Sequence, residues 1–394
     1  MEFRILTEED LLQQQELMRY SFNPTEGNYE GINLEELKKY VNPLTYFGLF
    51  DGDILASSLI IINYFQKIRG YTFKMGGIAG VATKPEYRRK GLVRKLFNEA
   101  FSFCLKEQMP ISTLYPFKYS YYEKFDYVWV DNLIFVTGLI SDIKKRSIKG
   151  YTIEEEKNYL EAITRIKPLY KLFYENIDGL IDRSRSNNVF ERRLDNGFFF
   201  FSKDEYDNDT GYIVLRFNDK ETIEIREFIA PDIETRQNLW NFLFLHKEHR
   251  RFFKMPDYFP HEIQTYPYIN EPKVEARQLI PNSMLRILNV QDVLTKIKYP
   301  YINESIEFSL VDNLCNWNQG FWSLTIFKGL STLKKIDKKE LMMEITIAGL
   351  ALLLSGFRNT TEIKESGFIT GTQEDLKKVD SIFPKGWYIV RDWF

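Results

Sequence analysis

The stretch VATKPEYRRKGLVRKL, residues 81–96, passes from an apolar segment through a turn rich in Lys and Arg into an amphipathic segment. The residues before the turn, 73–83, are apolar and glycine-rich, as in a buried strand, and Leu92, Leu96 and Ala100 recur after it at helical spacing. A helix that begins directly after a strand presents unpaired N–H groups and the positive end of its dipole to the turn. The stretch therefore predicts an α+β unit with an anion-binding turn, suited to a phosphate.

The residue types of the turn fit such a ligand. Gly91 lets the backbone approach an anion closely, and Arg88 and Arg89 can each add charge-assisted hydrogen bonds of about 1.5–3 kcal/mol. The turn lacks the Gly-Lys-Ser/Thr of a Walker loop, and its glycines do not follow the dinucleotide fingerprint. A solvated basic surface is the alternative interpretation of a charge run, but the order of strand, glycine and helix favours a binding turn.

The composition limits the classes of protein that remain. The 394 residues hold 53 Lys and Arg against 55 Asp and Glu, a net charge of −2, so the chain has no basic field for nucleic acid. Its two cysteines, Cys104 and Cys315, have no metal-ligand spacing and indicate neither zinc nor a disulfide framework. The most apolar run, residues 345–357, is shorter than the roughly 20 residues of a membrane span. We therefore expect a cytoplasmic protein of two or three domains, without metal, nucleic acid or membrane span.

The rest of the chain contains two further patterned regions. Residues 210–245 again read as two strands followed by a helix, but the intervening turn, 230–238, has no glycine and carries two acids. After residues 279–290 the chain changes to short strands, followed by the apolar run 345–357 with its Gly356 stop. That run predicts a buried helix or the lining of a lipid groove.

The pattern Arg88-Arg89-Lys90-Gly91-Leu92-Val93 resembles the pyrophosphate loop of the GNAT acetyltransferases, Gln/Arg-x-x-Gly-x-Gly/Ala, and departs from it at Val93. Together with YYEKFDY (residues 121–127), NSMLRIL (residues 282–288) and an aromatic last residue, it is similar to the Eis (enhanced intracellular survival) family of multi-domain acetyltransferases. The resemblance is strongest over residues 46–130.

The resemblance implies an α+β fold in three domains. Residues 1–130 would form an acetyl-CoA-binding GNAT domain, residues 131–282 a second GNAT-like domain without a CoA loop, and residues 283–394 a sterol-carrier-protein-like domain that supplies the C-terminus. It also implies acetyl-CoA as co-substrate and a closed homo-oligomer, up to a hexamer. The implied contacts to acetyl-CoA are the turn Arg88, Arg89, Lys90, Gly91, Leu92 and Val93 for the pyrophosphate, and main-chain groups of Val81 and Thr83 for the pantetheine and acetyl carbonyl.

Acetyl transfer to an amine needs a base that removes a proton from the amine and an acid that protonates the leaving thiolate. Histidine is a poor candidate, because all three histidines fall in the second domain. The tyrosine-rich segment 115–127 offers several phenols that are protonated at neutral pH, although any one of them taken alone reads as aromatic packing. In the resembled family the acid belongs to a Tyr-x-x-Phe-x-Tyr motif, which falls here on residues 122–127 and implies Tyr122 as general acid.

The chain ends with PKGWYIVRDWF, residues 384–394, without a polar tail. The resemblance implies that the terminal carboxylate enters the first domain's active site, so that the α-carboxylate of Phe394 is the general base and Asp392 helps attract a cationic acceptor. The alternative is that these aromatic residues only hold the end of the third domain in place.

Two classes of function remain. The favoured one is an acetyl-CoA-dependent N-acetyltransferase whose acceptor is an amine, such as an aminoglycoside, a polyamine or a lysine-like side chain. The alternative is a non-catalytic protein on a GNAT fold that binds acyl-CoA or lipid. Lipid binding by the third domain rests on fold resemblance alone, and fold does not imply function.

Overall fold

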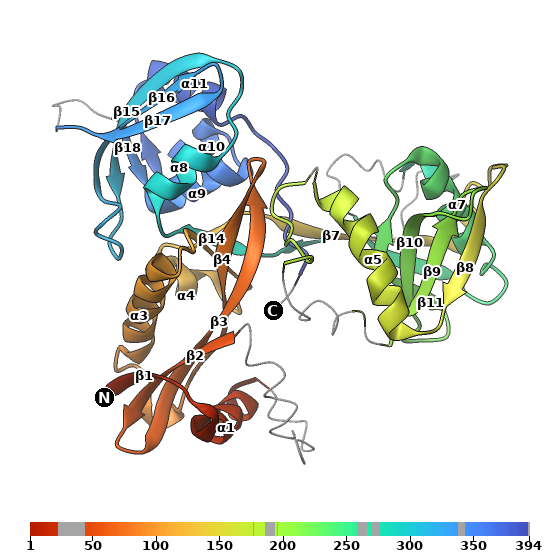
Figure 1. Ribbon diagram of the computed structural model, residues 1–394, viewed down its shortest axis with the longest axis horizontal. Coiled ribbons are helices and arrows are strands. Elements are labelled where there is room, and N and C mark those ends of the chain that lie inside the picture. Colours follow the sequence, from red (N-terminus) through yellow and green to blue (C-terminus); the bar gives the residue numbers. More distant parts are fainter. Residues whose placement is uncertain are drawn as a thin grey trace. The chain divides into compact units, whose positions relative to one another are not determined.

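The structure is a computed structural model that describes residues 1–22, 44–175, 177–185, 194, 196–257, 266–269, 276–337 and 343–392. Its contacts divide the chain into two compact units (Figure 1). One unit joins Met1–Val130 to Ser283–Tyr388, and the other joins Asp131–Asn282 to residues 389–392, called the C-terminal tail below. The end of the described chain thus belongs with the middle of the sequence.

The first domain is built on a mixed sheet in the order β1-β2-β3-β4-β5-β14-β6. Its strands are β1 (Glu2–Ile5), β2 (Leu44–Asp51), β3 (Ile54–Ile68), β4 (Tyr71–Thr83), β5 (Ile111–Leu114), β14 (Met284–Ile287) and β6 (Val128–Trp129). Its helices are α1 (Leu11–Phe22), α3 (Leu92–Lys106) and α4 (Tyr119–Tyr122). The helix predicted after the basic turn is confirmed, whereas the strand β1 before α1 was not expected.

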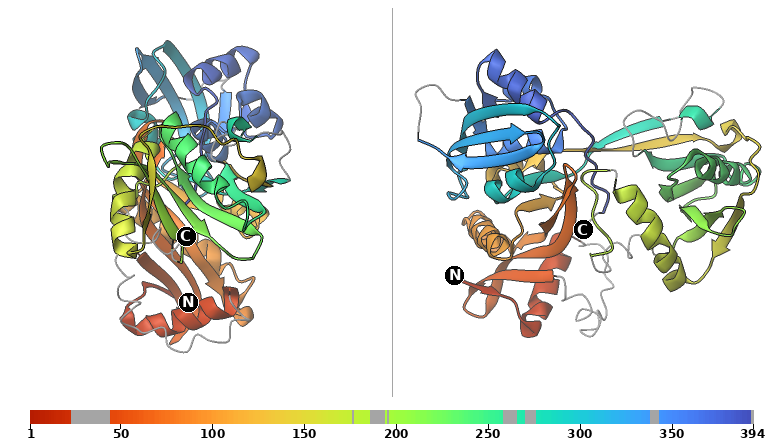
Figure 2. Two further views of the ribbon diagram at one scale, coloured as in Figure 1. Left: turned by 90° about the vertical axis from the view of Figure 1, so that its right-hand side faces the viewer. Right: turned by 45° about the horizontal axis from the view of Figure 1, so that its top comes forward.

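Helix α3 forms because its apolar residues fall on one side. Leu92, Leu96, Ala100 and Cys104 are spaced four apart and are all buried, with Phe97 and Phe101 beside them. They pack against β2, β3 and β4, and α3 lies along these strands (Figure 1 and Figure 2). This packing fixes the start of α3 beside the end of β4.

The second domain repeats this architecture with a sheet in the order β8-β9-β10-β11-β12-β7-β13. Its strands are β8 (Thr152–Glu156), β9 (Phe198–Lys203), β10 (Asp209–Arg216), β11 (Thr222–Ile229), β12 (Phe252–Asp257), β7 (Asn132–Leu139) and β13 (Ala276–Pro281). Its helices are α5 (Tyr159–Tyr174) and α7 (Ile233–Phe244). Among the described strands of these two sheets, the parallel pairs are β4–β5 in the first domain and β11–β12 in the second, so β11, α7 and β12 correspond to β4, α3 and β5.

The chain passes from the first sheet to the second and later returns to the first. β6 is followed by β7, which lies inside the second sheet, and β13 is followed by β14, which lies between β5 and β6 in the first. The crossings are paired within their own units: the Val130 amide donates to the Ser283 carbonyl, and the Asn282 amide donates to the Asp131 carbonyl. The first sheet is therefore completed by a strand that follows the whole second domain.

The third domain follows β14 in the chain and has a sheet in the order β17-β16-β15-β18-β19. Its strands are β15 (Asn303–Val311), β16 (Gly320–Phe327), β17 (Leu330–Lys335), β18 (Met343–Thr346) and β19 (Ile369–Thr370), and its helices are α8 (Val290–Lys296), α9 (Ile347–Ser355), α10 (Thr360–Glu365) and α11 (Gln373–Ile382). Every residue of α9 is buried, and Gly356 ends it in a left-handed conformation. The apolar run of the sequence is therefore a core helix, which packs on β14 and β6 of the first domain.

Across the described ranges, no helix combines the length and apolar character that crossing a bilayer requires.

Candidate functional site

Strand β4 carries a bulge near its end. Ser58 of β3 pairs with Ala82 and Ile60 pairs with Ala79, so that one residue of β3 opposes the two residues Gly80 and Val81 of β4. Gly80 has a φ of 55°, a conformation that favours glycine. A bulge of this kind bends the strand and redirects its backbone groups.

Beyond the bulge, β4 separates from its parallel neighbour. The pairing with β5 covers only Met75–Ile78, although β4 continues to Thr83. The Lys84 amide donates to the Ala56 carbonyl of β3, and because successive backbone groups of a strand alternate in direction, the main-chain groups of Val81 and Thr83 point away from β3. The end of β4 therefore offers backbone donors and acceptors on the side that β5 leaves.

The turn after β4 presents a cluster of backbone donors. Arg89 and Gly91 have φ angles of 62° and 76°, and α3 starts at Leu92 with no side-chain cap. The Lys95 amide is bonded to the Gly91 carbonyl, while no partner for the amides of residues 92–94 is found in the described part of the chain. The helix start is thus free to receive an anion, as the sequence predicts.

The three basic side chains of the turn are exposed. Arg88 Nε donates to the Thr83 carbonyl at 3.2 Å, and Lys90 Nζ lies 4.9 Å from the ring centre of Tyr87. A Cβ placed on Gly91 would meet no protein atom within 4 Å. Open space therefore lies in front of Gly91. Its left-handed backbone conformation favours glycine, whereas no neighbouring atom of the described residues would clash with a side chain there.

Tyr122 lies at the end of α4 and is buried in the same apolar cluster as Ile78 and Leu114, with Val81 packed against that cluster. Its ring packs edge-on against the ring of Phe97, with 6.3 Å between the two ring centres. Burial raises the pKa of the Tyr122 phenol, so it stays protonated at neutral pH. Among the described residues no hydrogen bond to its hydroxyl is found, which leaves the hydroxyl available to a ligand.

Tyr127, the other tyrosine of the motif, is committed to the core. Its hydroxyl lies 2.6 Å from Ser112 Oγ, which donates to the Gly76 carbonyl at 2.6 Å. Tyr127 is fully buried, and burial raises its pKa as well. The sequence motif contains both tyrosines. They differ in that the Tyr127 hydroxyl is bonded to Ser112, whereas no such bond is found for the Tyr122 hydroxyl among the described residues.

The predicted base cannot be placed, because Phe394 lies outside the described residues. The expectation for Asp392 is wrong. Its side chain is 3% exposed and accepts hydrogen bonds from Arg183 of the second domain, so it is not available to attract a cationic acceptor. Sequence reasoning could not find Arg183, which is 209 positions away in the chain.

The corresponding turn of the second domain is closed by its own side chains. Asp232 caps α7 by accepting from the Thr235 amide at 2.7 Å and from the Thr235 hydroxyl at 2.8 Å, and Arg236 donates to the Ala230 carbonyl. A carboxylate therefore stands where α3 leaves its amides open, and this turn is unsuited to a phosphate.

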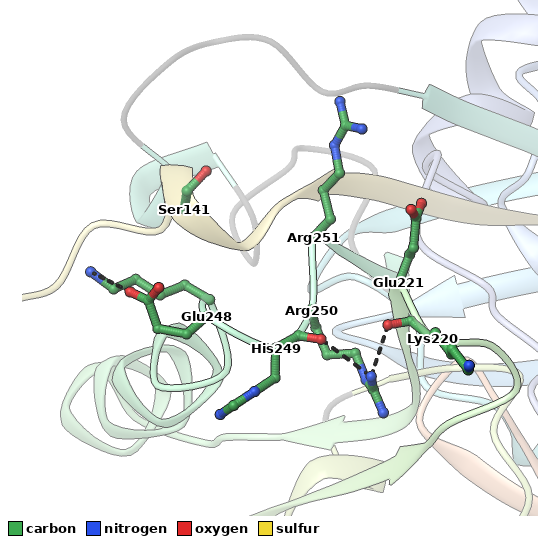
Figure 3. Close-up of a pocket in the computed structure, with 8 residues that line it drawn as sticks. Ser141, Lys220, Glu221, Glu248, His249, Arg250 and Arg251 are labelled. Atoms are coloured by element: carbon green, nitrogen blue, oxygen red, sulfur yellow. Dashed lines mark hydrogen bonds and ion pairs between the residues drawn. The ribbon is translucent and has the colours of Figure 1, made fainter.

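A cavity of about 310 Å³ lies at the other end of this domain, between the end of α7 and the start of β12 (Figure 3). It is lined by Ser141, Lys220, Glu221, Lys247, Glu248, His249, Arg250 and Arg251. Figure 3 shows the Arg250 guanidinium directed at the carbonyls of Lys220 and His249, and Lys247 pairs with Glu248. The basic side chains that line this cavity are balanced by Glu221 and Glu248, and Arg250 and Lys247 already have partners within the protein. We therefore assign the cavity no ligand.

Neither cysteine has the character of a nucleophile or metal ligand. Cys104 and Cys315 are buried free thiols, and burial raises the pKa of Cys104 to about 12. Within the described ranges, no three His, Cys, Asp or Glu side chains gather as a metal site would require.

The domains match known families. Residues 2–130 and 179–287 each match a family described as an acetyltransferase (GNAT) domain, and residues 290–387 match the sterol carrier protein domain. The chain therefore consists of two GNAT domains followed by a sterol-carrier-protein-like domain, which confirms the predicted fold class. No curated protein sequence gives a significant match.

Solved structures share this whole arrangement. A conserved protein from Enterococcus faecalis V583 is 20% identical with a TM-score of 0.87, covering 100% of this chain and 99% of that one. A GCN5-related N-acetyltransferase from Anabaena variabilis is 23% identical with a TM-score of 0.84, covering 100% of both chains. Eis1 from Mycobacterium abscessus is 13% identical with a TM-score of 0.78, again covering 100% of both. At these identities the likeness establishes the fold.

Proposed function

We propose that this protein is an acetyl-CoA-dependent N-acetyltransferase of the Eis type, which transfers an acetyl group directly to an amine such as an aminoglycoside, a polyamine or a lysine-like side chain. The observation that carries the proposal is the end of β4. A bulged strand parts from its parallel neighbour there and leads through Arg88–Gly91 into an uncapped helix. The second domain has the same strands but a capped helix, so we propose a single CoA site per chain.

The residues of this region fit the parts of acetyl-CoA. The amides at the start of α3 and the side chains of Arg88, Arg89 and Lys90 would hold the pyrophosphate, with Gly91, Leu92 and Val93 supplying backbone. The main chain of Val81 and Thr83 would bind the pantetheine and the acetyl carbonyl. Backbone contacts of this kind position the thioester without depending on side-chain rotamers.

Tyr122 would donate the proton that the leaving thiolate receives. A free thiol titrates near 8.5 and a phenol near 10, so the transfer is uphill, and the burial that raises the pKa of Tyr122 makes it more so. The same apolar surroundings also raise the pKa of a thiol held beside Tyr122, so the difference between the two pKa values becomes smaller. Tyr122 therefore acts best on a thiolate that is itself shielded from water.

The α-carboxylate of Phe394 would be the general base. An α-carboxyl ordinarily titrates at about 3.3–3.7, which is too acidic for a good base at pH 7, but burial among aromatic rings raises such a value. The support for this role is the family resemblance, together with a C-terminal tail that is buried up to Asp392.

The test measures release of free CoA thiol when the protein receives acetyl-CoA and a panel of aminoglycosides, polyamines and lysine peptides. We expect turnover with at least one amine. Binding of acetyl-CoA without turnover on any of them would favour the non-catalytic alternative. A variant with a few residues appended after Phe394 should bind acetyl-CoA and lose most turnover; wild-type turnover would place the base elsewhere.

A further inference from the structure

The C-terminal tail is held in the second domain by a buried ionic cluster. Arg183 Nη2 donates to Asp392 Oδ1 at 2.6 Å and Arg183 Nε to the same oxygen at 3.1 Å, while Arg183 Nη1 donates to Glu227 Oε2 at 3.1 Å. The side chains of Arg183, Asp392 and Glu227 are only 2%, 3% and 5% exposed. One guanidinium thus bridges a carboxylate of the tail and a carboxylate of the domain, in a setting that water does not screen.

The backbone of the tail is bound as well. The Ile389 amide donates to the Asp178 carbonyl at 2.9 Å, the Val390 amide donates to Asp131 Oδ2 at 2.9 Å, and Asn282 Nδ2 donates to the Val390 carbonyl at 2.7 Å. The residues are in close contact, since a Cβ on Gly179 would lie 2.6 Å from the Ile389 nitrogen. Backbone hydrogen bonds combined with a buried charged side chain are the features of a bound peptide.

The place where the tail binds corresponds to the substrate region of the first domain. β11 has a bulge like that of β4: Val214 pairs with Glu227 and Leu215 pairs with Ile225, which leaves Arg226 as the extra residue. Glu227 therefore stands at the position in β11 that matches the bulge of β4, where the proposed function puts the acetyl group.

The tail lies on the face of the sheet that α5 covers. Ile389 packs in the cluster formed by α5 with Tyr212 and Val214, whereas α7 packs with Ile213 and Leu215 on the opposite face. Tyr170 of α5 donates from its hydroxyl to Asp392 at 3.4 Å, and the Tyr212 hydroxyl donates to Glu227 at 2.8 Å. Helix α5 follows the edge strand β8 of its sheet as α1 follows the edge strand β1 of the first sheet, so the two faces correspond.

We infer that the second GNAT domain is a receptor for the chain's own C-terminal tail: the face of its sheet that α5 covers, at the bulge of β11, binds residues 389–392 as a built-in peptide ligand, and Arg183 is the positioning residue that fixes this segment. The cluster holds residues 389–392 immediately before the segment to which the proposed function gives the general base. The link to turnover rests on the proposed role of the terminal carboxylate, whereas the binding of the tail does not.

The substitution Asp392→Asn tests this inference in the full-length protein. It removes the negative charge of the Asp392 side chain and leaves Arg183 paired with Glu227, so the buried guanidinium keeps a carboxylate partner. Because the charge-assisted pairing with Arg183 is weakened, we expect hydrogen exchange at the Ile389 and Val390 amides to be at least about tenfold faster. Glu365→Gln, which removes an exposed charge from α10, is the control and should change neither amide.

The same variant separates the inference from the proposed function. We expect Asp392→Asn to lower kcat about tenfold or more with an unchanged KM for acetyl-CoA, because the chain end is released while the CoA turn is intact. Faster exchange with unchanged kcat would support the receptor and contradict the terminal carboxylate as base. Unchanged exchange at both amides would overturn the receptor.

A second measurement uses a chain that ends at Tyr388 and a synthetic peptide of residues 389–394. The peptide should bind to the shortened chain by calorimetry, and a peptide carrying Asp392→Asn should bind at least about tenfold more weakly. Equal binding of the two peptides, or binding of neither to a folded shortened chain, would overturn the inference. If the shortened chain does not fold, the exchange experiment on the full-length protein decides.

Discussion

Replacing Gly91 with Ala tests the anion turn most directly, because the structure separates the cost to folding from the cost to binding. Gly91 has a φ of 76°, and a Cβ there would contact no protein atom within 4 Å. The folded protein therefore loses only the left-handed backbone preference, about 1–2 kcal/mol. In a unit of this size each kcal/mol lowers Tm by about 2–4 °C, so we expect a decrease of roughly 2–8 °C.

Binding should suffer more than folding. The new methyl group would occupy the open space in front of the turn, where the pyrophosphate is proposed to lie. Loss of one hydrogen bond to a charged group, about 1.5–3 kcal/mol, raises Kd about 10- to 150-fold. Calorimetry with acetyl-CoA measures this change directly.

Gly52 provides the matched control. It lies in the turn between β2 and β3 with a φ of 59°, and a Cβ there also contacts nothing within 4 Å. Gly52→Ala should therefore lower Tm by a similar amount and leave the Kd for acetyl-CoA unchanged. If Gly91→Ala binds acetyl-CoA as tightly as Gly52→Ala does, the pyrophosphate does not lie on this turn.

Three further predictions concern Tyr122 and assembly. Tyr122→Phe should keep acetyl-CoA binding and lower kcat by about 10²–10⁴, while Tyr121→Phe keeps most turnover; the reverse result would show that the motif is misaligned. Because burial raises the pKa of Tyr122, its phenol stays protonated through the usual assay range. The pH profile of kcat should therefore show no alkaline loss from this residue below about pH 10. A Tyr122-dependent loss of kcat near about pH 8 would contradict its role as the acid. Light scattering should give the mass of a closed homo-oligomer, up to a hexamer, and a monomeric mass would reject the assembly that the resemblance implies.

The sequence predicted the local parts of the site because these depend on neighbouring residues. The spacing of Leu92, Leu96 and Ala100 indicated the helix after the basic turn, and the structure has α3 there. The glycine, the arginines and the strand before them indicated an open anion-binding turn. In residues 230–238, the absence of glycine and the two acids indicated the opposite, and Asp232 does cap α7. Helix periodicity, turn conformation and capping all act over a few residues, so they can be read locally.

Only the tertiary structure decided which distant segments meet. β14 completes the first sheet from beyond the whole second domain, and no local pattern in residues 282–288 specifies that partner. Likewise the motif contains Tyr122 and Tyr127 within six residues, and only the fold shows that the Tyr127 hydroxyl is bonded to Ser112 in the core.

Asp392 shows the physical reason for this limit. Next to an aromatic chain end it reads as a charge exposed to an incoming cation. In the fold it is buried and accepts hydrogen bonds from Arg183, which also donates to Glu227 of β11. The sequence determines which side chains carry charge, whereas burial and partners, which set what a charge can do, arise only when the sheets and helices pack.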